Sequence, residues 1–209
     1  QYQQIIFDCD GVILDSNEIK SNAFSETLID EDEELVKQFI DFHKENGGIS
    51  RFKKFDYFFN KIKNQKIYEK SLNNALKRYA KLSYEGLKNA SEIDGVRSLL
   101  IKLKEFEIDS FVISGGEQNE VRRVLKHQNL NKYFKNIYGS PISKEDHLIN
   151  IKPTNSLYFG DAKSDYIAAK NFDIDFVFIS GASDWDNGVE FCKSMNIIEM
   201  KDFSELTYL

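Results

Sequence analysis

A short apolar segment at the start of the chain is separated from every other predicted strand by a long stretch with helical periodicity. Residues 3–8 are predicted to form a buried strand that ends at an acid and runs into a turn at Gly11. From Asp15 to about Ala90, apolar residues recur every three or four positions among Lys, Glu and Asn, as in amphipathic helices. The simplest assembly is therefore one sheet domain interrupted by an all-helical insertion.

Strands and helices alternate in the rest of the chain. Strands are predicted over 110–113, 136–138, 156–159 and 175–179, and helices over 96–106, 118–128, 163–170 and from residue 144. This order predicts a parallel sheet with helices on both faces. The expected fold class is α/β, with a doubly wound, mainly parallel Rossmann-like sheet and an inserted all-α cap domain.

The predicted boundaries place residues 1–14 and 92–209 in the α/β core and residues 15–91 in the helical cap. The insertion leaves the core just beyond the carboxyl end of the first strand. Open α/β sheets bind their ligands at this edge. We therefore expect the cap to act as a lid over a site.

Composition narrows the classes of partner. The chain has 209 residues, a net charge of −6 and only two cysteines, and its longest apolar run is Phe176 to Ile179. No membrane span is expected from so short a run, and the acidic balance argues against a nucleic-acid backbone as the main partner. The cysteine usage suits a reducing compartment, so we expect a cytoplasmic protein. The oligomeric state stays open.

Two carboxylates follow the first predicted strand. Asp8 and Asp10 are two residues apart, and Gly11 allows the backbone to turn sharply beneath them. Both side chains can therefore face one site. Alternatively, the acids cap nearby backbone amides in an ordinary turn.

Polar residues also follow three later strands. Ser114 and Gly115 end one strand and leave backbone N–H groups available to an anion. Asp161 and Asp165 follow another strand, four residues apart, and Lys144 lies beyond the loop after a third. Carboxylates, a hydroxyl, a lysine and glycine turns are therefore expected to meet at one rim of the sheet.

With these four motifs, in this order and with helices inserted after the first, the chain resembles the haloacid dehalogenase-like superfamily over nearly its whole length. The resemblance implies a Mg²⁺-dependent phosphatase. It implies that Asp8 is the nucleophile that becomes an aspartyl-phosphate and that Asp10 is the general acid and base. Ser114, Gly115 and Lys144 are expected to bind the phosphate.

The resemblance also implies a metal site. Asp8, Asp161 and the backbone carbonyl of Asp10 are expected to bind Mg²⁺, and Asp165 is expected to support the metal or Lys144. Mg²⁺ prefers oxygen ligands and would offset the repulsion between a carboxylate nucleophile and a phosphate dianion. The presence of Asp10 favours phosphate chemistry, because dehalogenases of this superfamily usually lack an acid at this position.

Substrate identity is expected to depend on the cap. Residues 46–51 lie between two predicted helices, and their two glycines allow a tight loop that could dip towards the phosphate. Arg51 is the candidate for a substrate contact. Alternatively, the glycines end one helix and Ser50 caps the next, with no ligand involved.

Three functions remain open from the sequence. The first is hydrolysis of a small phosphorylated metabolite, such as a sugar phosphate or a phosphoglycolate-like acid. The second is a phosphomutase that returns the phosphoryl group from Asp8 to the substrate. The third is a regulatory or binding module that is only phosphorylated, although a lid and a proton donor are not needed for that role.

Overall fold

The computed structural model describes residues 2–208, so Gln1 and Leu209, the outer ends of the predicted core, lie outside the described part. Within it, every pair of neighbouring strands is parallel, and the sheet has the order β3-β2-β1-β4-β5-β6. The strands are β1 (Gln4–Phe7), β2 (Asp109–Glu117), β3 (Asn136–Ser140), β4 (Ser156–Gly160), β5 (Asp175–Ile179) and β6 (Ile198–Met200).

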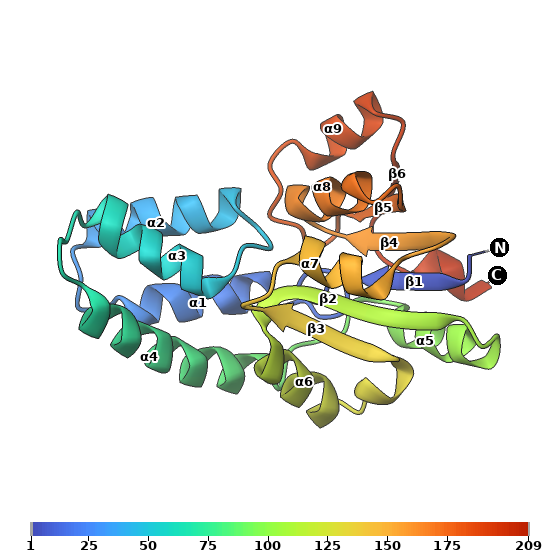
Figure 1. The fold of residues 1–209 in the computed structure, drawn as a ribbon, viewed down its shortest axis with the longest axis horizontal. Coiled ribbons are helices and arrows are strands. Elements are labelled where there is room, and N and C mark those ends of the chain that lie inside the picture. Colours follow the sequence, from blue (N-terminus) through green and yellow to red (C-terminus); the bar gives the residue numbers. More distant parts are fainter. Residues whose placement is uncertain (1, 209) are drawn as a thin grey trace.

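Helices cover both faces of this sheet (Figure 1). The helices of the core are α5 (Val96–Glu105), α6 (Gln118–His127), α7 (Lys144–Ile151), α8 (Lys163–Asn171) and α9 (Gly188–Ser194), with 3-10 turns at Asn131–Tyr133 and Ser204–Tyr208. Alternate residues of β1 point to opposite faces: Ile5 and Phe7 share a buried cluster with α5 and α6, and Ile6 shares one with α7 and α8. The predicted doubly wound α/β fold is confirmed.

The helices between β1 and α5 form the cap, which extends from the carboxyl edge of the sheet (Figure 1). It comprises α1 (Asn17–Thr27), α2 (Glu33–Glu45), α3 (Arg51–Tyr57), a π-helical turn (Phe58–Ile62) and α4 (Glu69–Leu87). Its apolar interior is separate from that of the sheet domain and is largely aromatic, with Phe24, Phe39, Phe55, Phe58 and Tyr79 buried together. The cap therefore has its own core.

Two linkers join the cap to the sheet domain, and they run side by side. The backbone N–H of Asp15 donates to the carbonyl of Ser91 (2.9 Å), and that of Ile93 donates to the carbonyl of Ile13 (3.0 Å). Leu14 and Glu92 form the antiparallel bridge between these bonds. The chain thus enters and leaves the cap at one place.

Two features differ from the sequence prediction. β2 continues to Glu117 instead of ending near Ile113, with a break in its register against β3 after Ile113. α9 and β6, which follow β5, were not predicted. Among residues 2–208, no helix is both long and apolar enough to cross a bilayer.

Candidate active site

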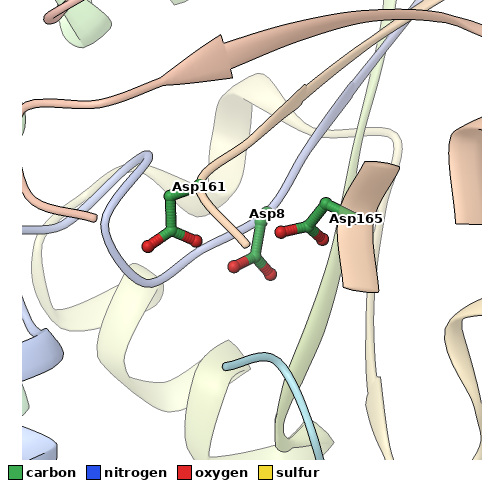
Figure 2. Close-up of side chains that lie close together, drawn as sticks. All are labelled: Asp8, Asp161 and Asp165. Carbon is green, nitrogen blue, oxygen red and sulfur yellow. The ribbon is translucent and has the colours of Figure 1, made fainter. Parts of the chain in front are cut away.

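Three carboxylates meet at the carboxyl edge of the sheet. Asp8 follows β1, Asp161 follows β4, and Asp165 lies in the first turn of α8. Each of the three offers an oxygen, and these oxygens all lie within 4.8 Å of one another. Figure 2 shows Asp8 between the other two. Because β1 and β4 are parallel neighbours, their ends bring residues that are remote in sequence to one point.

Lys144, at the start of α7, joins this cluster. Its Nζ lies 3.0 Å from Oδ1 of Asp8 and also donates to Asp165. Asp165 additionally accepts hydrogen bonds from the Tyr158 hydroxyl (3.0 Å) and the Ala162 backbone N–H (3.1 Å). These bonds fix Asp165, and Asp165 in turn holds the ammonium beside Asp8.

The cluster carries more negative than positive charge. Burial raises the pKa of Asp8 to about 7, against the opposing charge of Lys144, and Asp165 and Asp10 raise it further. Burial, together with Asp8 and Asp165, raises the pKa of Asp161 well above its usual value. Burial would lower the pKa of Lys144, but Asp165 and Asp8 outweigh it and raise that pKa. One lysine thus faces three buried carboxyl groups, a set that favours an additional cation.

Asp161 is held by a residue that the sequence reasoning missed. The amide of Asn17 donates to Oδ2 of Asp161 (2.7 Å) and to the carbonyl of Ala182 (2.8 Å). Gly11 leaves room for this contact: its φ is +72°, and a Cβ there would lie 2.2 Å from Oδ2 of Asp161. Gly11 therefore serves both the turn and the close approach of the carboxylate.

Asp10 forms an ion pair with Lys20, a second residue that the sequence reasoning missed. The hydroxyl of Ser16 donates to its Oδ1 (2.6 Å), and Lys20 of α1 forms an ion pair with its Oδ2. Burial disfavours the ionised form, but the charge of Lys20 and both hydrogen bonds outweigh burial and lower the pKa of Asp10. Nothing in the sequence distinguishes Lys20 from other lysines on the amphipathic helices of the cap.

A cavity of about 480 Å³ lies between the cap and the sheet. Asp8, Asp10 and Asp161 line its floor together with Gly115, and Gly47 and Gly48 of the cap line its other side. A Cβ on Gly115 would lie 2.1 Å from the carbonyl oxygen of Gly48, so the two backbones are in contact. The loop that begins at residue 46 therefore lines the cavity, which is one of the two interpretations that the sequence left open.

Ser114 is buried near this floor but does not line the cavity. Its Oγ accepts a hydrogen bond from the Gly116 N–H (2.9 Å). This N–H is one of the backbone donors that were expected to bind an anion, and it already has a partner within the strand. A Cβ on Gly116 would lie 3.2 Å from this Oγ and 3.4 Å from the Lys20 Nζ. The hydroxyl thus lies on the side of the site that carries Asp10 and Lys20.

Arg51 lines the same cavity, but its guanidinium is already engaged. It binds both carboxylate oxygens of Glu120 on α6, and Ser83 of α4 donates to the same carboxylate (3.1 Å). The guanidinium also lies over the ring of Tyr79, 4.5 Å from its centroid. Ser50 caps α3 as the alternative reading expected, since it accepts the N–H of Phe52 (3.2 Å). Arg51 thus joins cap to core at the edge of the cavity.

Comparison with known proteins identifies related sequences and folds. The family model described as haloacid dehalogenase-like hydrolase matches residues 5–179. No curated protein matches the chain in sequence.

Several solved structures share the fold. A β-phosphoglucomutase from Clostridium difficile aligns with a TM-score of 0.79 and 21% identity, over 99% of this chain and 93% of that one. A protein described as a predicted phosphoglycolate phosphatase from Haemophilus somnus 129pt aligns with a TM-score of 0.76 and 17% identity, over 98% and 96%. A predicted phosphatase from Clostridium acetobutylicum aligns with a TM-score of 0.74 and 21% identity, over 99% of this chain and 97% of that one. At these identities the likeness concerns the fold.

Proposed function

Because the chain belongs to the haloacid dehalogenase-like hydrolase family, we propose that it is a Mg²⁺-dependent phosphatase that hydrolyses a small phosphorylated metabolite through an aspartyl-phosphate on Asp8. The observation that carries this proposal is the buried cluster of Asp8, Asp161 and Asp165 with Lys144, in which Asp8 and Asp161 line the floor of a cavity covered by a cap. A covalent phosphoryl intermediate needs such a carboxylate, held against a countercharge and shielded from water.

The donor set fits a hard divalent cation. Three carboxylates offer oxygens within 4.8 Å of one another, and one lysine leaves their charge uncompensated. Asp8, Asp161 and the backbone carbonyl of Asp10 would hold Mg²⁺, with Asp165 as a further ligand or as the support of Lys144. When bound, the ion supplies positive charge that lets the nucleophile approach a phosphate dianion.

Asp8 and Asp10 would divide the reaction between them. An oxygen of Asp8 bonds to phosphorus as the bond from phosphorus to the alcohol oxygen breaks, and Asp10 gives its proton to the departing alcohol. Asp10 then removes a proton from the water that attacks the aspartyl-phosphate, and the products are inorganic phosphate and free Asp8. The lowered pKa of Asp10 beside Lys20 favours the ionised state that the second step needs, so the first step would draw on the protonated form in equilibrium with it.

The remaining predicted residues would bind the substrate. Lys144 lies 3.0 Å from Asp8 and would neutralise the transferring group. Ser114 and the backbone of Gly115 would hold its other oxygens from the opposite side. Arg51 would contact the substrate from the cap, with the guanidinium hydrogens that Glu120 does not use.

Asp8→Asn tests the proposal. Wild-type protein should release inorganic phosphate from a panel of phosphate esters only with Mg²⁺, and Asp8→Asn should lower kcat by at least about 10⁴-fold while circular dichroism shows an unchanged fold. A trapped phosphoryl group on Asp8 in Asp10→Asn would support Asp8 as the nucleophile and Asp10 as the base of the second step. Metal-independent turnover by Asp8→Asn would overturn the mechanism.

A phosphomutase would use the same site but return the phosphoryl group to the substrate. Product analysis on sugar phosphates separates the two: inorganic phosphate accumulates in one case and an isomerised sugar phosphate in the other. A regulatory module that is only phosphorylated would not release phosphate over repeated turnovers. The cavity beside Asp8 and the acid at Asp10 favour an enzyme over such a module.

A further inference from the structure

One buried cation lacks a counter-ion. Among residues 2–208, the buried cationic side chains are Arg51, Lys54 and Lys144. Arg51 pairs with Glu120, and Lys144 pairs with Asp8 and Asp165. Lys54, on α3 and only 3% exposed, has no carboxylate within 4.0 Å in this part of the chain. Lysine is rarely buried without a partner, because an ammonium loses its hydration there.

Lys54 is instead held by a neutral histidine. Its Nζ lies 2.6 Å from Nδ1 of His43 and donates to the His43 backbone carbonyl (3.1 Å). The other ring nitrogen of His43 lies 3.1 Å from the Ser21 hydroxyl. Burial and the charge of Lys54 lower the pKa of His43 to about 2, so the ring is uncharged and accepts at Nδ1. Two of the three ammonium hydrogens thus have acceptors.

The ammonium is part of the wall of the active-site cavity. Lys54 and His43 line the cavity whose floor carries Asp8 and Asp10. Asp184, in the loop after β5, also lines the cavity, and both it and Asp10 favour the charged form of Lys54 from beyond ion-pair distance. Lys54 lies three residues after Arg51, one turn further along α3. A ligand that reaches from the floor to the cap would therefore meet this cation.

We infer that Lys54, positioned by His43, binds a second negatively charged group on the substrate, a carboxylate or a second phosphate carried by the part that leaves. This inference rests on the proposed function, because it names the class of substrate for the same site. The preferred substrates are then phosphate esters that carry another anion, rather than esters of neutral alcohols.

An anion accounts for the position of Lys54 better than a neutral acceptor does. His43 already supplies two neutral acceptors, and the ammonium stays poorly stabilised: burial and the charge of Lys20 lower the pKa of Lys54 to about 7, against the opposing effects of Asp10 and Asp184. A sugar hydroxyl would add only a third neutral acceptor. A bound carboxylate or phosphate would supply the missing charge beside a buried ammonium, where the interaction is strong.

Matched pairs of esters test the inference. 3-Phosphoglycerate and glycerol 3-phosphate differ in a carboxylate, and fructose 1,6-bisphosphate and fructose 6-phosphate differ in a phosphate. Wild-type kcat/KM should be at least tenfold higher for the doubly anionic member of one pair, and the pair that responds identifies the group. Lys54→Met should lower that ratio at least tenfold, chiefly through KM, and Lys54→Arg should retain most of it.

Lys53→Met is the matched control, because Lys53 is the exposed neighbour on the same helix and does not line the cavity. It should leave the ratio unchanged. A wild-type ratio near one for both pairs, or a ratio that Lys54→Met does not alter, would overturn the inference even if the protein is an active phosphatase.

Binding without turnover separates this inference from the proposed function. Trp185 is the only tryptophan of the chain and lines the cavity, so its fluorescence reports occupancy. In Asp8→Asn, 3-phosphoglycerate or fructose 1,6-bisphosphate should bind at least tenfold more tightly than its partner, and adding Lys54→Met should remove the difference. If this holds while the wild type hydrolyses no ester, the anion site stands and the phosphatase proposal fails. Equal affinities in both pairs would contradict the anion site.

Discussion

The pairing of Lys20 with Asp10 is the residue contact with the clearest chemical consequence. The pKa of Asp10 stays low although the side chain is buried, because Lys20 and Ser16 stabilise its ionised form. A carboxylate with a lowered pKa stabilises the folded protein above its usual pKa of 3.8 and loses this contribution as the pH falls. In the proposed mechanism, Lys20 would thus bias Asp10 towards acting as a base.

Lys20→Met should move the acidic limb of the pH profile. Without the ammonium, burial dominates and the pKa of Asp10 rises, so the fraction of Asp10 able to act as a base falls at a given pH. The acidic limb for hydrolysis of the aspartyl-phosphate should shift to higher pH, as measured by single-turnover kinetics between pH 4 and pH 8. Lys37→Met, an exposed lysine on α2, is the control. An unshifted limb would mean that Lys20 does not set the protonation of Asp10.

Sequence reasoning located some of the side chains at the site but not their partners. Asp8, Asp161 and Asp165 follow or flank strand ends, and a parallel sheet brings such ends to one edge, so their meeting could be predicted. Asn17 and Lys20 lie on a helix of the cap, and their role depends on how the cap sits on the sheet. No periodicity or spacing in a single sequence encodes that placement.

At the scale of elements, most helices and strands of the core followed from the sequence, whereas α9, β6 and the extension of β2 did not. β1, β4 and β5 have buried apolar residues and turn signals at their ends. β6 is a three-residue edge strand whose Ile198 is 65% exposed, so it carries no alternating pattern. The extension of β2 runs through two glycines, which sequence rules assign to a turn.

The ion pair between α3 and α6 is expected to stabilise the contact between the cap and the sheet domain. Arg51 and Glu120 are buried, and Ser83 of α4 bonds to the same carboxylate. Glu120→Gln leaves the guanidinium buried without its counter-ion, and we expect it to lower the free energy of unfolding by roughly 3–5 kcal/mol. Urea denaturation followed by circular dichroism measures the change.

An exposed ion pair in the cap provides the comparison. Arg78 and Asp30 lie 3.0 Å apart with side chains 44% and 86% exposed, so Asp30→Asn should cost only about 0–1 kcal/mol. If Glu120→Gln costs no more than Asp30→Asn, the buried pair does not tie the two parts together.

At the scale of the whole molecule, we expect the proposed metal binding to be coupled to stability. Asp8, Asp161 and Asp165 repel one another in a buried cluster, and burial with this repulsion raises the pKa of Asp161. Mg²⁺ should therefore stabilise the folded protein, by about 2.7 kcal/mol when its concentration is about a hundred times Kd. For a chain of this size, that stabilisation raises the Tm by about 5–10 °C.

Asp161→Asn separates the contribution of this cluster from a general salt effect. It removes a buried charge, so the Tm without metal should rise, and it removes a ligand, so the shift with Mg²⁺ should shrink. Differential scanning calorimetry with MgCl₂, and with NaCl at matched ionic strength, measures both. A Mg²⁺ shift of equal size in wild type and Asp161→Asn would place the ion elsewhere.

Because the two linkers lie side by side, the helical insertion is attached to the sheet domain at a single place. Because residues 13–15 and 91–93 are hydrogen-bonded neighbours, a short turn could join them and close the sheet domain without it. Strand order and register depend on none of the excised residues. One contiguous stretch of gene could therefore be exchanged while the strands that carry Asp8 and Asp161 are kept, provided that the new stretch supplies partners equivalent to Asn17 and Lys20.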